Sequence, residues 1–172
     1  MIKILGGLII FLSMTALGLK KSVVVEKRLD ILNEFEKSLV LLKGEIKYSA
    51  ASLPESVLSV SNRTNGMIRD FYKNVCETIL NSPEVLFSKV WEDECRKTFS
   101  LEEINQEDLS LIIDLGSQLG HLDVDMQIKN IELCINRLKE RQLDATEDIK
   151  NKSKLYKTLG ISGGALLTLL LL

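Results

Sequence analysis

The stretch LGSQLGHLDVDMQIKNIELCINRLKE (Leu115–Glu140) decides the fold, because it contains one helix end, a short turn and the next helix start. Gly120 fits the left-handed backbone conformation that ends many helices. Asp123 can accept a hydrogen bond from the free N–H groups of a new helix, and Asp123 and Asp125 favour its positive dipole end. Apolar residues then recur every three or four positions, so the stretch predicts a helical hairpin.

The same signals extend through the middle of the chain. A long helix is expected from Leu29 to Tyr48, continuous with the apolar segment before it. Ser52 or Leu53 as the cap before Pro54 and Glu55, and later Asn105 as a cap, are typical of helix starts. The positions expected to be buried are Leu29, Leu32, Phe35, Leu39, Leu42, Ile46, Met67, Phe71, Val75, Leu80, Trp91, Leu109, Ile112, Ile113, Leu119, Val124, Ile128, Ile131, Ile135 and Leu138. With 5% aromatic residues and two prolines, the chain is predicted to be all-α, an antiparallel bundle of five or six helices.

Both ends of the chain are apolar. Residues 4–19 and 158–172 contain no charged side chain, whereas all 24 acidic residues lie between them. Each stretch is slightly short of the hydrocarbon core, but neighbouring apolar residues and snorkelling lysines can extend it. We therefore expect a transmembrane helix at each end. The predicted domains are an N-terminal transmembrane helix with its juxtamembrane segment (1–26), a cytoplasmic helical bundle (27–154) and a C-terminal transmembrane helix (155–172).

The orientation in the membrane follows from basic residues beside the apolar ends. These residues are Lys20, Lys21, Lys27, Arg28, Lys150, Lys152, Lys154 and Lys157. The positive-inside rule places the middle of the chain in the cytoplasm. The alternative is an exported, tail-anchored helical protein whose N-terminal segment is a signal peptide cleaved near Gly18. Gly160 and Gly164 either let a second membrane helix pack closely or are tolerated without such a partner.

No pattern in the sequence predicts a reaction centre. The motifs for phosphate loops, dinucleotide sites, zinc proteases and nucleophile elbows are missing from it. The single histidine, His121, is expected in a turn, and Cys76, Cys95 and Cys134 are expected to be buried free thiols. A net charge of −2 does not favour nucleic acid. We expect a binding protein without cofactor or metal, and not an enzyme.

Three stretches resemble a known family. They are the front hairpin LVLLKGEIKYSAASLPESV (Leu39–Val57), the back hairpin LGSQLGHLDVDMQIKNIEL (Leu115–Leu133) and the tail LGISGGALLTLLLL (Leu159–Leu172). All three are similar to the stage III sporulation protein AB family of endospore-forming bacteria. The matching positions are Glu45, Ile46, Tyr48, Leu53, Pro54, Glu55, Leu115, Gly116, Leu119, Gly120, Asp123 and Gln127. Leu122 departs from the small polar residue that is usual there.

The resemblance implies a function in sporulation. The family's soluble domain is similar to the cytoplasmic domains of inner-membrane platform proteins in type II secretion and type IV pilus machines. The resemblance therefore implies a non-enzymatic platform in the outer forespore membrane, on the mother-cell side. The implied partners are the secretion-ATPase-like stage III sporulation protein AA, other stage III sporulation membrane proteins and the lipid bilayer. The resemblance also allows the protein to form a homo-oligomer.

The matching residues are candidate interaction residues, and two hypotheses apply to the junction between Gly120 and Asp123. In the first, positive φ at Gly120 and the cap at Asp123 fix the hairpin. In the second, the junction contacts the ATPase together with Gln127, one turn further along the helix. Gly116 is expected to serve tight helix packing rather than a membrane contact, because Ser117 and Gln118 are polar.

Overall fold

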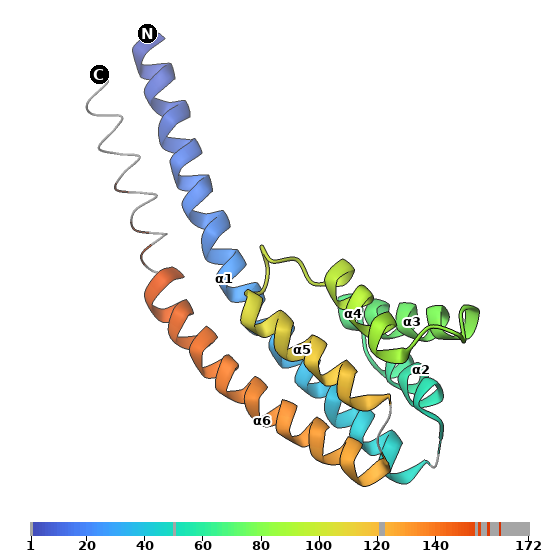
Figure 1. Cartoon of the computed structure of the whole chain (residues 1–172). Helices are drawn as coiled ribbons and strands as arrows, with labels where there is room; N and C mark the ends of the chain where they lie inside the picture. Colours follow the sequence, from blue (N-terminus) through green and yellow to red (C-terminus); the bar gives the residue numbers. More distant parts are fainter. Residues whose placement is uncertain are drawn as a thin grey trace. The chain divides into compact units, whose positions relative to one another are not determined.

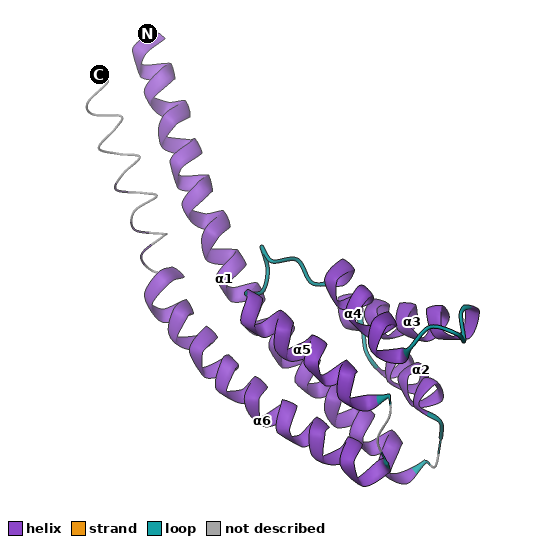
Figure 2. Cartoon of the chain, viewed as in Figure 1, coloured by secondary structure: helices purple, strands orange, loops and turns teal. Residues whose placement is uncertain are grey.

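The computed structural model of the chain describes residues 2–49, 51–120, 123–153, 155, 158 and 162. These residues form six α-helices and a short π-helix, with no strand among them (Figures 1 and 2). The elements are α1 (Ile2–Tyr48), α2 (Leu53–Arg63), α3 (Gly66–Asn81), α4 (Phe87–Thr98), α5 (Gln106–Leu119), α6 (Val124–Asp148) and η1 (Ile149–Ser153). For this part of the chain, the predicted all-α fold is confirmed.

The chain divides into two compact units. The bundle unit consists of Asp30–Gln142, and the end unit combines residues 1–29 with residues 143–172. Helix α1 is continuous through the predicted N-terminal span, as expected. Within the described part of the chain, no helix combines the length and apolar character that a membrane crossing requires. The transmembrane helices are thus not confirmed, and Gly160, Gly164 and most of 155–172 lie outside the described residues.

Capping side chains set the helix starts in the bundle unit. The backbone N–H and the hydroxyl of Ser52 both donate to Glu55 Oε2, at 2.7 and 2.8 Å. These bonds hold the pKa of Glu55 below its ordinary value. At the start of α5, Asn105 Oδ1 accepts from the N–H of Asp108 at 2.8 Å. Both predicted starts are therefore confirmed, because the signals that specify them are local.

An aromatic cluster forms the centre of the bundle unit. Phe35 of α1 is fully buried, and four ring centroids lie between 5.9 and 6.5 Å from its own, those of Phe71, Tyr72, Trp91 and Phe99. The indole N–H of Trp91 donates to the carbonyl of Ile112 at 2.8 Å. The polar group of the tryptophan is therefore satisfied inside the core.

Most of the predicted buried positions are confirmed, and two are wrong. Leu80 is 66% exposed and Val124 is 51% exposed. Leu80 belongs to the last turn of α3 and Val124 to the first turn of α6. Helix ends project beyond the neighbouring helices, so helical spacing alone overestimates burial there.

Candidate interaction site at the end of the bundle

Helices α1 and α6 run antiparallel in the bundle unit. Lys139 Nζ lies 3.8 Å from Glu36 Oε1, and Lys43 Nζ lies 3.4 Å from Glu132 Oε1. Glu36 and Lys43 are seven residues apart in α1, and their partners Lys139 and Glu132 are seven residues apart in the reverse direction in α6. Counting five more residues along each helix in the same register places Tyr48, at the end of α1, level with Gln127, near the start of α6. The two helix ends lie at the same end of the bundle unit in Figure 1.

The front motif holds the connection from α1 to α2. Arg63 Nη1 donates to Glu45 Oε1 at 2.9 Å, which ties the end of α2 to α1. Leu53 and Pro54 are half-buried. Tyr48 is 78% exposed, with Lys47 Nζ 5.2 Å from the centroid of its ring. The front motif therefore has structural members and one side chain that faces solvent.

The back motif packs α5 against α4. Leu115, Gly116 and Leu119 are buried. A Cβ added to Gly116 would lie 2.1 Å from Cδ1 and 2.3 Å from Cγ of Trp91. The tryptophan therefore occupies the space that any other residue at position 116 would need. The prediction that Gly116 serves tight helix packing is confirmed.

The prediction of a left-handed Gly120 is wrong. Gly120 has φ −79° and ψ −15°, which is right-handed helical backbone that any residue adopts. The backbone continues past the last residue of α5 in its helical sense, so no left-handed residue is needed there. Its close neighbour is Phe87, whose Cβ would lie 3.3 Å from an added Cβ. Among the described glycines, the positive φ of +57° belongs to Gly66, the first residue of α3.

Asp123 caps α6, as predicted. Its Oδ1 accepts from the backbone N–H of Met126 at 2.8 Å. His121 and Leu122, which complete the junction, lie outside the described residues.

We expect Asp123→Ala to lower the free energy of unfolding by about 0.5–2 kcal/mol, because a capping hydrogen bond is lost. Asp123→Asn keeps an oxygen acceptor and should change it little. Gly120→Ala should lower the free energy of unfolding by less than about 1 kcal/mol, because alanine can adopt the φ of position 120 and Phe87 need move only slightly. Thermal melts of the detergent-solubilised full-length protein, followed through Trp91 fluorescence, measure all three. Equal losses for the alanine and asparagine variants at position 123 would contradict the cap.

Exposed apolar and acidic residues meet at the end of the bundle. We call Tyr48, Asp123, Val124, Asp125 and Met126 the bundle-end surface; Val124 is 51% and Met126 42% exposed, and both aspartates are exposed. The acidic side chains of this surface are Asp123 and Asp125, and it contains neither Lys nor Arg. Such a surface fits a partner with apolar and basic groups. Sequence reasoning missed Met126 and assigned Val124 to the core.

The described residues show no arrangement suited to a reaction. Among them, no group of three or more His, Cys, Asp or Glu side chains could hold a metal ion. Cys76, Cys95 and Cys134 are free and buried, as predicted. Burial raises the pKa of Cys134 to about 12 and also raises that of Cys95. These two thiols are therefore neutral at physiological pH and poor nucleophiles.

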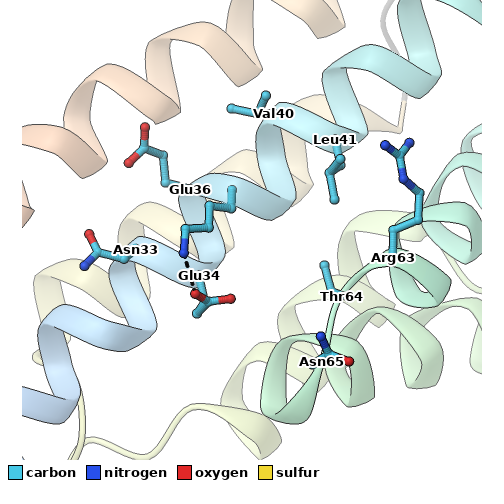
Figure 3. A pocket seen from close by; sticks show the side chains of 9 residues that line it. Asn33, Glu34, Glu36, Val40, Leu41, Arg63, Thr64 and Asn65 are labelled. Atoms are coloured by element: carbon cyan, nitrogen blue, oxygen red, sulfur yellow. Dashed lines mark hydrogen bonds and ion pairs between the residues drawn. The ribbon is translucent and has the colours of Figure 1, made fainter.

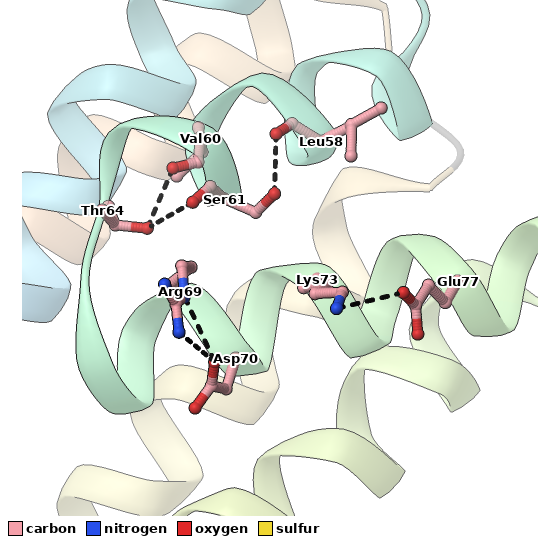
Figure 4. Close-up of polar contacts among 8 residues, drawn as sticks. All are labelled: Leu58, Val60, Ser61, Thr64, Arg69, Asp70, Lys73 and Glu77. Atoms are coloured by element: carbon pink, nitrogen blue, oxygen red, sulfur yellow. Dashed lines mark hydrogen bonds and ion pairs between the residues drawn. The ribbon is translucent and has the colours of Figure 1, made fainter.

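On the bundle unit, ion pairs occupy charged groups on the walls of two open grooves. The larger, of about 600 Å³, lies between α1 and the link from α2 to α3 (Figure 3). Its Lys37 pairs with Glu34 at 2.7 Å. The smaller, of about 360 Å³, lies along α2 and α3. Figure 4 shows the Lys73–Glu77 pair beside it, at 3.6 Å. Cys76 and Glu77 both line the smaller groove, but burial and the charge of Glu77 raise the pKa of the Cys76 thiol, which donates to the carbonyl of Pro54.

The fold and site define an all-α domain whose matching residues build a hairpin and an exposed surface. A model of the stage III sporulation protein AB family matches residues 3–172, so the chain belongs to this family. It is similar to stage III sporulation protein AB of Bacillus subtilis (strain 168), with 22% identity over 172 residues that cover the whole of both chains. No solved structure matches the chain. The resemblance seen in the three motif stretches is confirmed, and with it a role in sporulation.

Proposed function

We propose that this chain is a non-enzymatic platform of a secretion-like apparatus between mother cell and forespore, and that it docks the stage III sporulation protein AA ATPase. Membership of the family supports the setting in sporulation. The observation that carries the docking is the bundle-end surface, where Tyr48 at the end of α1 is 78% exposed and Val124 and Met126 at the start of α6 are 51% and 42% exposed. Exposed apolar side chains at one place on a small domain are typical of protein interfaces.

The apolar ends of the chain would hold this platform in the outer forespore membrane. Residues 4–19 and 158–172 supply two uncharged stretches, and the basic residues beside them favour a helical domain in the mother-cell cytoplasm. Gly160 and Gly164 offer a surface to other stage III sporulation membrane proteins. The lipid bilayer would then contact the two ends of the sequence, and the ATPase would contact residues from its middle.

Some residues of the two hairpins stabilise the fold, and others are exposed and available for binding. Gly116, Leu115 and Leu119 are buried and fix the fold. Asp123 caps α6 while it remains exposed. The side chain of Tyr48 does not form part of the core, because most of its surface faces solvent. Its ring is therefore the side chain whose removal should separate binding from stability.

We expect Tyr48→Ala to weaken binding of the purified ATPase at least about tenfold, since exposed aromatic anchors often dominate interface energies. The melting temperature should stay within the range of ordinary surface substitutions. The measurement is biolayer interferometry with the full-length protein immobilised in nanodiscs. Leu101→Ala is the matched control, because Leu101 is 59% exposed but lies in the turn between α4 and α5.

Two outcomes contradict the docking surface. Either Tyr48→Ala binds the ATPase like the unaltered protein, or Leu101→Ala loses as much affinity. A third outcome, no binding of the ATPase to the unaltered protein, contradicts the platform function itself.

Asp125→Lys should mainly slow association, because a basic partner would lose electrostatic attraction.

A further inference from the structure

The end unit carries concentrated positive charge. From Lys20 to Arg28 the chain has four basic residues and one acidic residue, Glu26. From Ile149 to Lys157 it has four lysines and no acidic residue. Both segments belong to the end unit. We call these eight basic residues the basic collar: Lys20, Lys21, Lys27, Arg28, Lys150, Lys152, Lys154 and Lys157.

An ion pair aligns the two segments. Arg28 Nη1 lies 3.2 Å from Asp148 Oδ2, and the arginine side chain is only 11% exposed. Lys27 directly precedes Arg28 in α1, and Lys150 follows Asp148 by two residues. Lys27 and Lys150, one on each segment, are both exposed. The π-helix η1 (Ile149–Ser153) begins directly after Asp148, and such local widening is frequent at functional positions.

We propose that the basic collar binds the headgroups of anionic phospholipids. Each segment of the collar adjoins an apolar end of the chain, so the inference rests on the proposed membrane attachment. At that position lysine side chains reach the headgroup region and attract negative lipids. The end unit has four acidic residues, Glu26, Asp144, Glu147 and Asp148, against the eight basic residues of the collar, and anionic headgroups would supply further negative charge.

The experiment compares phosphatidylglycerol with phosphatidylcholine on the full-length protein in neutral detergent. Native mass spectrometry gives the occupancy of each lipid. We expect the unaltered protein to prefer phosphatidylglycerol, and the preference to fall as salt rises. The variant with Lys150, Lys152, Lys154 and Lys157 all changed to Gln should lose roughly 10- to 100-fold of this preference, given the contribution of each lysine near a lipid surface.

The matched control removes the same charge from the bundle unit. Lys73, Lys89, Lys97 and Lys139 are exposed lysines of four different surface positions, and all four are changed to Gln. This variant should keep the preference for phosphatidylglycerol. Equal binding of the two lipids by the unaltered protein overturns the inference. So does an equal loss of preference in the control variant.

The inference and the proposed function fail in different ways. If the protein partitions out of vesicles in an alkaline carbonate wash, the proposed membrane attachment is wrong. If it stays in vesicles and binds the ATPase, but shows no preference between lipids, only the collar is wrong. The collar variant should still bind the ATPase, because its substitutions lie outside the bundle unit.

Discussion

Gly116→Ala is expected to lower the free energy of unfolding of the helical domain by about 1–3 kcal/mol, the range typical of an overpacked core. A Cβ at this position would lie 2.1 Å from Cδ1 and 2.8 Å from Cβ of Trp91. The tryptophan cannot simply rotate away, because its N–H bond to the carbonyl of Ile112 and its ring contacts fix it. Urea unfolding of the full-length protein in detergent, followed by circular dichroism, measures the loss.

Gly44→Ala is the control for this substitution. Gly44 lies inside α1, and nothing lies within 4 Å of an added Cβ there. The alanine should stabilise the domain by about 0.5–1 kcal/mol, because alanine favours helix over glycine. The two glycines should therefore shift the unfolding midpoint in opposite directions. A Gly116→Ala variant as stable as Gly44→Ala would show that α4 and α5 do not meet through Trp91.

Local signals made much of the fold predictable. The starts at Ser52, Asn105 and Asp123 each depend on a polar side chain and an N–H group within three residues. Helical spacing identified the buried face of α1 for the same reason, since it needs no knowledge of the neighbours. Where the outcome depended on distant residues, as at Leu80 and Val124, the same rule failed.

Gly120 shows why a turn signal can mislead. A glycine after an apolar run favours a left-handed cap, yet helical backbone continues through this one. Its neighbour Phe87 comes from α4, more than thirty residues earlier in the chain. The constraint on position 120 is therefore partly a packing constraint between helices. No pattern within α5 could distinguish that from a cap.

The sequence predicted which residues belong to the candidate site, but it did not predict how they are arranged in space. The motif residues were identified one by one, but only the register of α1 against α6 brings Tyr48 level with the start of α6. That register depends on pairs such as Lys43 with Glu132, which are far apart in the sequence. Exposure then separates Tyr48 from the buried residues of the same motifs.

Phe35→Ala is expected to cost about 3–5 kcal/mol, the range for removing a large aromatic side chain from a core. Phe35 is fully buried and is the ring that the other four members of the cluster share. Small domains are stable by only about 5–15 kcal/mol, so this loss would unfold a sizeable fraction of the protein on moderate heating. Thermal melts by far-ultraviolet circular dichroism measure it independently of Trp91.

Two variants on the same helix make the result specific to the cluster. Phe35→Leu fills part of the space and should cost clearly less than Phe35→Ala, because the cavity is smaller. Val40→Ala removes a side chain that is 49% exposed and should change stability by about 0.5 kcal/mol or less. If Phe35→Ala melts at the temperature of Val40→Ala, then α1 does not supply the centre of the core.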